Sequence, residues 1–410
     1  MNYLSDRVKK MAESETLAMT RVANELKSQG LDVISLSIGE PDFDTPLSIK
    51  DFAKKAIDEN WTHYPPVPGY LDLRKAISNK FKRDNNLNYA PNQIVVSTGA
   101  KQAIYETVMA LVNPGDEVII PTPYWVSYKE IVKMAEGTPI FIKTTIENDF
   151  KLTPAQLEAA ITPKSKLIMY SSPSNPTGTP YSKEELKALA DVIAKYPNLF
   201  VMADEIYEHI IFEGKHESIA QFDSIYNQVI TINGVAKGFA MTGWRIGFLG
   251  ASEEIAKACD KLQGQITSGA CSISQRAVLQ AVEEDPKTSK DIINMRETFK
   301  KRRDMMYEYL KKIPGIKINL PMGAFYFFVN VESYYGKKVP ASSKFVEMYK
   351  KNQIENSTDM CMYFLYDAQV ALVQGEAFGD DGCVRISYAT SEDKLKEALK
   401  RIEKALANLM

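Results

Sequence analysis

Hydrophobic residues follow two spacings along the chain, and these spacings predict helices and strands in alternation. Apolar residues three and four positions apart are typical of amphipathic helices, and short β-branched runs are typical of buried strands. Helices are predicted at Ser48–Asn60, Tyr70–Asp84, Lys101–Val112, Ser127–Ala135 and Lys183–Lys195. Seven strands are predicted at Ile94–Ser97, Glu117–Ile120, Pro139–Lys143, Lys166–Tyr170, Phe200–Ala203, Val229–Ile232 and Ile246–Leu249.

This alternation favours an α/β architecture, in which helices cover both faces of a mainly parallel sheet. Ligands of such sheets bind beyond the carboxyl ends of the strands, so residues directly after strands are candidates for function. A segment at each end of the chain breaks the alternation. The N-terminal part predicts a helix and a short strand, at Arg7–Lys27 and Val33–Leu36. The C-terminal part predicts a smaller α+β unit, with elements at Pro286–Lys312, Ala324–Asn330, Ser342–Lys351, Val370–Val373, Val384–Ser387 and Glu392–Leu409.

Composition excludes several classes of protein. The 410 residues suffice for two domains, and the net charge of −2 gives no bulk attraction for nucleic acid or anionic lipid. No apolar run approaches the roughly 20 residues of a membrane span, and Met1–Arg21 lacks the apolar stretch of a signal peptide. The four cysteines show neither metal-type pairing nor a disulfide scaffold. We therefore expect a cytoplasmic protein without a metal centre.

The segment from Gly234 to Gly247 carries the most informative chemistry. It follows a predicted buried strand and places Lys237 among small residues, with Arg245 eight positions further on. A lysine amine condenses with an aldehyde to form a Schiff base, and burial or nearby positive charge assists by favouring the neutral amine. An arginine fork suits phosphate. Alone, each is more often a solvated surface residue. Together they suggest pyridoxal 5′-phosphate (PLP), which carries an aldehyde and a phosphate.

Two further strand ends fit the same cofactor. The turn Ser97–Gln102 leads into a helix, so the free amide groups of Gly99, Ala100 and Lys101 meet the positive end of the helix dipole and can cradle an anion. Asp204 ends another buried strand, where an unpaired carboxylate is costly. A protonated pyridine nitrogen is a suitable partner, because the ion pair keeps the ring able to accept electrons.

The whole stretch 234–247 resembles, position by position, the lysine signature of the class I PLP-dependent aminotransferases, and the chain most resembles their aspartate aminotransferase subgroup (Ib type). The resemblance implies the PLP-dependent transferase fold type I. A large PLP-binding domain over residues 46–305 would contain a mainly parallel seven-stranded sheet sandwiched by helices. Residues 1–45 and 306–410 would form the smaller α+β domain with its N-terminal arm.

The resemblance also implies the cofactor contacts. Trp125 would lie flat against the ring and, with Asn175, border the substrate. Asn175, in an Asn-Pro-x-Gly turn, and Tyr207 would donate to the ring oxygen, and Asp204 would pair with the ring nitrogen. Cis peptide bonds are implied before Pro123 and Pro176. Tyr64, in a Tyr-x-x-x-x-Gly loop, would reach the phosphate of a neighbouring subunit, so that the active form would be a homodimer with composite sites.

Substrate contacts are implied as well. Arg385 would grip the α-carboxylate, and Gly39 would touch the substrate. Lys101, with Ser14 and Thr16, would receive a distal carboxylate. The sequence departs from the family around Gln374–Gly375, and the Met360–Tyr366 stretch is hard to align, so the substrate-facing edge of the small domain is less well defined than the cofactor site.

The implied reaction is the ping-pong transfer of an amino group from aspartate to 2-oxoglutarate, giving oxaloacetate and glutamate, with Lys237 as the Schiff-base lysine and proton shuttle. The partners would be amino acids and 2-oxo acids. Alternatives are an aminotransferase for aromatic or neutral amino acids or for prephenate, and a PLP lyase on the same fold. A role as the effector domain of a transcription regulator would need a DNA-binding domain, for which the chain leaves no room.

Overall fold

A computed structural model of the chain describes residues 3–13 and 15–410, and its larger part is built on one seven-stranded sheet. The strand order is β2-β8-β7-β6-β5-β3-β4. β8 runs antiparallel to both of its neighbours, and the other pairs are parallel. The strands are β2 Ile94–Ser97, β3 Glu117–Thr122, β4 Thr138–Lys143, β5 Ser165–Ser171, β6 Phe200–Asp204, β7 Val229–Gly234 and β8 Gly247–Gly250. The predicted mainly parallel sheet is confirmed.

Helices cover both faces of this sheet, because residues of each strand point alternately to either side. Ile119 packs on one face with α4, α8 and α10, whereas Val118 and Ile120 pack on the other with α5, α6 and α9. The helices of this part are α3 Leu47–Asp58, α4 Leu71–Asn85, α5 Ala100–Leu111, α6 Ser127–Met134, α7 Pro154–Ala160, α8 Lys183–Ile193, α9 Glu253–Ile266 and α10 Ser272–Glu283.

The same alternation gives the end of β6 two different neighbourhoods. Met202 lies in the cluster of α5, α6 and α9, and Ala203 lies in the cluster of α4, α8 and α10. Asp204, two positions beyond Met202, therefore faces the α5 and α6 side, and Glu205 faces the α4 side.

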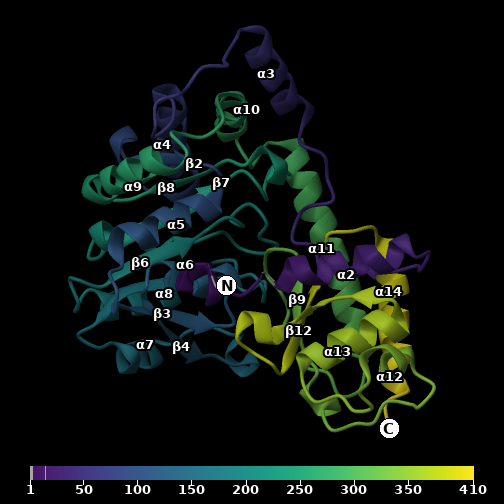
Figure 1. Ribbon diagram of the computed structural model, residues 1–410. Coiled ribbons are helices and arrows are strands. Elements are labelled where there is room, and N and C mark those ends of the chain that lie inside the picture. Colours follow the sequence, from purple (N-terminus) through teal and green to yellow (C-terminus); the bar gives the residue numbers. More distant parts are fainter. Residues whose placement is uncertain (1–2, 14) are drawn as a thin grey trace.

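A smaller part, beside the sheet in Figure 1, combines residues from both ends of the chain. Two sheets lie in it: the antiparallel order β11-β12-β9, and a parallel pair, β1 with β10. Its strands are β1 Ile34–Ser35, β9 Tyr326–Asn330, β10 Val370–Ala371, β11 Val373–Gln374 and β12 Cys383–Ser387. Its helices are α2 Glu15–Ser28, α12 Lys344–Tyr349, α13 Ser357–Tyr363 and α14 Glu392–Ala407. The short α1 Asp6–Lys9 lies instead beside α6 of the larger part, where Arg7 pairs with Glu136.

One long helix, α11 (Lys290–Leu310), joins the two parts (Figure 1). Its first turn contributes Ile292 to the core beneath α4, α8 and α10, whereas Met295 and Phe299 belong to the core of the smaller part. The helix is continuous through residue 305, where the family resemblance implies a domain boundary. That boundary stays a prediction.

Several local expectations differ from the structure. The single N-terminal helix is two helices, and α7 was not predicted. Residues 370–373 form two short strands with different partners. The Met360–Tyr366 stretch covers the end of α13 and the start of a π-helix at Phe364–Ala368.

Of the two implied cis peptide bonds, the one before Pro123 is present. The second cis bond precedes Pro173 and not Pro176, so the expectation for Pro176 is wrong. Within the described ranges, no helix combines the length and apolar character that a membrane crossing requires.

Candidate active site

A cavity of about 390 Å³ opens at the carboxyl ends of the central strands, between the large sheet and the smaller part. Eleven residues singled out from the sequence line it, and they come from strand ends, a helix start and loops throughout the chain: Gly39, Gly99, Ala100, Lys101, Trp125, Asn175, Asp204, Tyr207, Lys237, Arg245 and Arg385. The edge of the sheet therefore brings together residues up to 346 positions apart, from Gly39 to Arg385.

Lys237 follows β7 and extends its amine into the cavity. Its Nζ atom donates to the carbonyl oxygen of Gly39 at 2.5 Å, and no carboxylate lies within ion-pair distance among the described residues. Burial lowers the pKa of this amine to about 8. The charges of Arg385 and Arg245 contribute to this lower pKa, while Glu40 and Asp204 partly oppose the shift. The neutral amine, which nucleophilic attack on an aldehyde requires, is therefore far more populated near pH 7 than in an exposed lysine.

Asp204 lies at the end of β6, buried on the α5 and α6 side. The hydroxyl of Tyr128 donates to Oδ2 at 2.8 Å, and the amide of Ile206 donates to Oδ1 at 3.3 Å. Burial raises the pKa of Asp204 to about 6, although both hydrogen bonds lower it. A carboxylate with so little compensation favours a cationic partner in the cavity.

An anion cradle forms where β2 turns into α5. Gly99 is the N-cap residue of α5 and has a φ of 82°, a conformation that favours glycine. A Cβ atom there would lie 2.5 Å from Nη2 of Arg245, so the guanidinium packs against the bare backbone. Arg245 itself donates to the carbonyl of Thr242 at 3.0 Å and has no carboxylate partner in the described part of the chain. Its charge and the free amides of the helix end suit a phosphate group.

Arg385 reaches the opposite wall of the cavity from β12. The residue is only 2% exposed, yet among the described residues it has no carboxylate partner. Nη1 donates to Oδ1 of Asn175 at 3.0 Å and Nη2 donates to the carbonyl of Ser37 at 2.6 Å, whereas Nε finds no hydrogen-bond partner in the part of the chain that the structure describes. The guanidinium lies 4.6 Å from the ring centre of Tyr326. Because a buried, unpaired cation is costly, this site is built for an external anion.

Three residues connect the lysine to the smaller part. The hydroxyls of Tyr207 and Tyr326 share a hydrogen bond of 2.8 Å, and the ring of Tyr207 lies 5.9 Å from Nζ of Lys237. A Cβ on Gly39 would lie 2.8 Å from the Tyr326 hydroxyl. Only a glycine at position 39, which lacks a side chain, allows this close approach of the Tyr326 hydroxyl.

The mouth of the cavity carries a further cation. Lys101, the second residue of α5, is exposed, and its ammonium lies 4.9 Å from the ring centre of Trp125. Partial desolvation lowers the pKa of Lys101, and the charge of Arg245 adds to the effect. A second cavity of about 420 Å³ shares Lys101, Val126 and Ser127 with the first and extends along the N-terminal arm.

Tyr64 is not in the cavity, because it lies on the outer surface and is 92% exposed. Ser14 lies outside the described residues, as does the side chain of Thr16. Sequence reasoning missed Tyr128 and Tyr326, which touch Asp204 and Arg385. Tyr128 is one residue into a predicted helix and Tyr326 is within a predicted strand, so only their periodic, inward-facing positions gave a signal.

Comparisons with known proteins agree with this geometry. Residues 31–402 match the family described as aminotransferase class I and II. A bifunctional aspartate aminotransferase and glutamate/aspartate-prephenate aminotransferase of Petunia hybrida is 46% identical over 99% of this chain and 83% of its own length. An aspartate/prephenate aminotransferase of Cereibacter sphaeroides is 42% identical over the full length of both chains.

Solved structures give the same result. The crystal structure of the aspartate aminotransferase from Rhizobium meliloti superimposes with a TM-score of 0.94 at 41% identity, over 100% of both chains. The fold is thus that of an aminotransferase. The chain belongs to the class I and II aminotransferase family, and the similar proteins named here all carry aspartate aminotransferase in their names.

Proposed function

We propose that the protein is a PLP-dependent aminotransferase that transfers the amino group of aspartate to 2-oxoglutarate. The observation that carries the proposal is the set of groups in one cavity of about 390 Å³. A lysine amine with a lowered pKa, a buried carboxylate and two arginines without carboxylate partners in the described chain all face it. An aldehyde, a ring nitrogen, a phosphate and a substrate carboxylate would each find one complementary group.

The residues fit the cofactor in detail. Arg245 and the amides of Gly99 and Ala100 would hold its phosphate, Asp204 would hold a protonated ring nitrogen, and Lys237 would hold its aldehyde carbon. When bound, PLP withdraws electrons from the Cα of the amino acid and so makes that proton removable.

The protein supplies position and proton transfer. The free amine of Lys237 would be the base that removes the Cα proton and then delivers that proton to the former aldehyde carbon of the cofactor. Arg385 fixes the substrate α-carboxylate, because its unpaired Nε and fork can engage two oxygens. Tyr128 keeps Asp204 aimed into the cavity from behind.

Specificity for a second carboxylate is the finer part of the proposal. Lys101 places a cation at the mouth of the cavity, and relatives that share 42–46% of the sequence are named for aspartate. Prephenate, whose ring bears a distal carboxylate, is a second candidate. The adjoining cavity of about 420 Å³ offers room for a ring, and the same relatives are named for prephenate.

We further propose a homodimer with composite sites. A tyrosine that is 92% exposed on the outer surface is unusual, and Tyr64 follows α3, whose first residue Leu47 and whose last-turn residue Ile57 are also exposed. A second copy covering this surface would bury these apolar side chains.

The test follows the absorbance of the reconstituted protein while single amino acids are added. Aspartate and glutamate should convert the lysine-bound chromophore at micromolar to millimolar concentrations, and alanine and phenylalanine should do so far less efficiently. Lys101→Ala should raise KM for aspartate about tenfold or more and leave that for phenylalanine within about twofold. Equal losses for both would defeat the specificity, and a wild-type protein that never forms the chromophore would defeat the cofactor assignment.

A further inference from the structure

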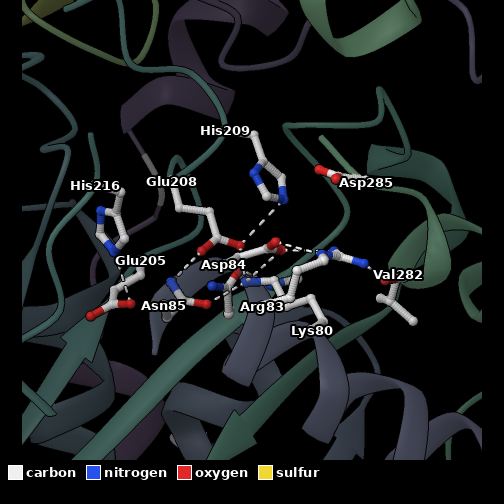
Figure 2. A network of polar contacts seen from close by, with 12 residues as sticks. Lys80, Arg83, Asp84, Asn85, Glu205, Glu208, His209, His216, Val282 and Asp285 are labelled. Carbon is white, nitrogen blue, oxygen red and sulfur yellow. Dashed lines mark hydrogen bonds and ion pairs between the residues drawn. The ribbon is translucent and has the colours of Figure 1, made fainter. Parts of the chain in front are cut away.

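Figure 2 shows a cluster of charged side chains. It lies on the α4 side of β6, whereas Asp204 faces the cavity on the other side. It joins the last turns of α4 to the segment that follows Asp204. Lys80 and Glu208 are both buried and form a direct ion pair at its centre. Asn85 connects the two, since its Nδ2 donates to Oε2 of Glu208 at 2.7 Å and its Oδ1 accepts from Lys80 at 2.7 Å.

The cluster contains a set of groups that suits a metal ion, but a side chain takes the cation's place. Asp84, Glu208 and His209 present ligand atoms within 4.8 Å of one another. The ammonium of Lys80 is paired with Glu208 and lies 3.8 Å from Oδ2 of Asp84. The carboxylates therefore already share a built-in cation, and the cluster compensates itself.

His209 connects this cluster to the loop after β7 that carries Lys237. Its Nε2 lies 3.3 Å from Oε1 of Glu208, and its ring meets the ring of Phe239 edge-on at 5.7 Å. The imidazole also packs on Gly238: a Cβ atom at that glycine would lie 2.8 Å from Cδ2 of His209. Gly238 directly follows Lys237, so the imidazole supports the backbone from which the cavity lysine projects.

We propose that His209 is a positioning residue for Lys237, and that the buried Lys80–Glu208 pair holds His209 in place. The inference deepens the proposed function and rests on it. Asp204 and Tyr207 face the cavity from the same segment that presents Glu205 and Glu208 to α4. The segment 204–209 thus positions both the carboxylate of Asp204 and, through His209, the amine of Lys237.

The physical reason lies in the sensitivity of proton transfer to distance. In the described chain, the amine of Lys237 makes one hydrogen bond, to Gly39, so its position depends mainly on the backbone of its own loop. That backbone has the imidazole on one side. A displacement of about 1 Å at a reacting group costs on the order of 100-fold in rate.

The first test is a double-mutant cycle on the reconstituted enzyme. His209→Ala should lower kcat about 10- to 100-fold with KM for aspartate within about threefold, and shift the pH midpoint of the lysine–PLP absorbance. Gly238→Ala should lower kcat in the wild-type background, where the new methyl meets the imidazole. It should lower kcat much less in the His209→Ala background, where that clash is gone.

The double variant Lys80→Met/Glu208→Gln tests whether the buried ion pair holds His209 in place. It also tests the proposal if His209→Ala does not fold. Both charges leave together, and the new amide can still pair with Asn85, so the fold should persist. We expect kcat to fall about 3- to 10-fold with a shifted absorbance midpoint. The matched control is Arg83→Met. Arg83 belongs to the same cluster, but it binds Asp84 at 2.6 Å and the carbonyl of Val282 at 3.1 Å and not Glu208 or His209. Its kcat and midpoint should match the wild type.

Wild-type kcat and midpoint in either folded test variant, or additive effects in the cycle, would overturn the inference while leaving the proposed function intact. A wild-type protein without a lysine-bound chromophore would instead overturn the proposed function.

Discussion

Asp204 and Glu208 are both buried carboxylates in one short segment, yet their surroundings shift their pKa values in opposite directions. Burial raises the pKa of Asp204 to about 6, and the hydrogen bonds from Tyr128 and the Ile206 amide only partly oppose this shift. Burial would raise the pKa of Glu208 too, but Lys80, His209 and His216 outweigh it and lower that pKa. The cavity face of the segment is left uncompensated, and the α4 face is compensated within the protein.

The buried cations divide in the same way. Lys80 pairs with Glu208, and Arg302 makes two hydrogen bonds to Asp42 at 2.6 and 2.9 Å. Lys237 and Arg385 have no carboxylate partner among the described residues, and both line the cavity. Because proteins rarely leave buried charge unpaired, the missing partners mark the place where ligand charges belong.

Removing the unpaired amine should have the largest effect on function and little on stability. Lys237→Ala should lower kcat by about 10⁴-fold, since both the covalent link and the proton carrier are lost. Borohydride treatment of the PLP-loaded variant should give no adduct at this position. The apoprotein should unfold at the same denaturant concentration as the wild type or a higher one. Turnover within about tenfold of the wild type would refute the role of this lysine.

Breaking a compensated pair should do the reverse. Glu208→Ala leaves Lys80 buried without its main partner and should lower the free energy of unfolding by about 3 to 5 kcal/mol. Denaturant unfolding of the apoprotein measures this loss. Arg83→Met, at the half-exposed rim of the cluster, should cost less. Equal stability of Glu208→Ala and wild type would show that the pair is not compensating charge.

A change at Arg385 should weaken the binding of substrates that carry an α-carboxylate. Arg385→Lys keeps the charge but removes the fork, so kcat/KM for aspartate should fall about 100-fold. The half-reaction with an amine that lacks an α-carboxylate should change little. A comparable loss for that amine would mean that Arg385 supports the fold of the cavity and does not bind the carboxylate.

The smallest expected effect is a pH dependence of stability. A carboxyl whose pKa is raised by folding keeps a proton that the unfolded chain releases, so Asp204 should make the apoprotein less stable as pH rises from about 4 to about 6. The loss is at most about 3 kcal/mol and should be absent in Asp204→Asn. Glu208 acts below that window and with the opposite sign, since its stabilisation is lost as pH falls below about 4. A wild-type profile parallel to that of Asp204→Asn would contradict the raised pKa.

Much of the fold could be predicted because its signals are local. β2 has the predicted bounds, and most other strands of the large sheet differ by one or two residues, since buried parallel strands are short apolar runs. The eleven cavity residues were found because each follows a strand or belongs to a recognisable motif.

The parts that were not predicted depend on contacts between distant residues. The Tyr128–Asp204 hydrogen bond spans 76 positions, and the Tyr207–Tyr326 bond spans 119. Tyr128 and Tyr326 stand in no local pattern that distinguishes them from core aromatic residues. Likewise, the division of residues 370–373 between two sheets is decided by their partners, β1 and β12, and not by their own sequence.

The course of α11 has a practical consequence for protein engineering. Because its side chains enter two separate cores, a cut or a crossover near residue 305 would split a continuous helix and leave an apolar stripe open on each fragment. Chimeras with related enzymes should therefore inherit this helix whole, together with the surfaces it packs against on either side.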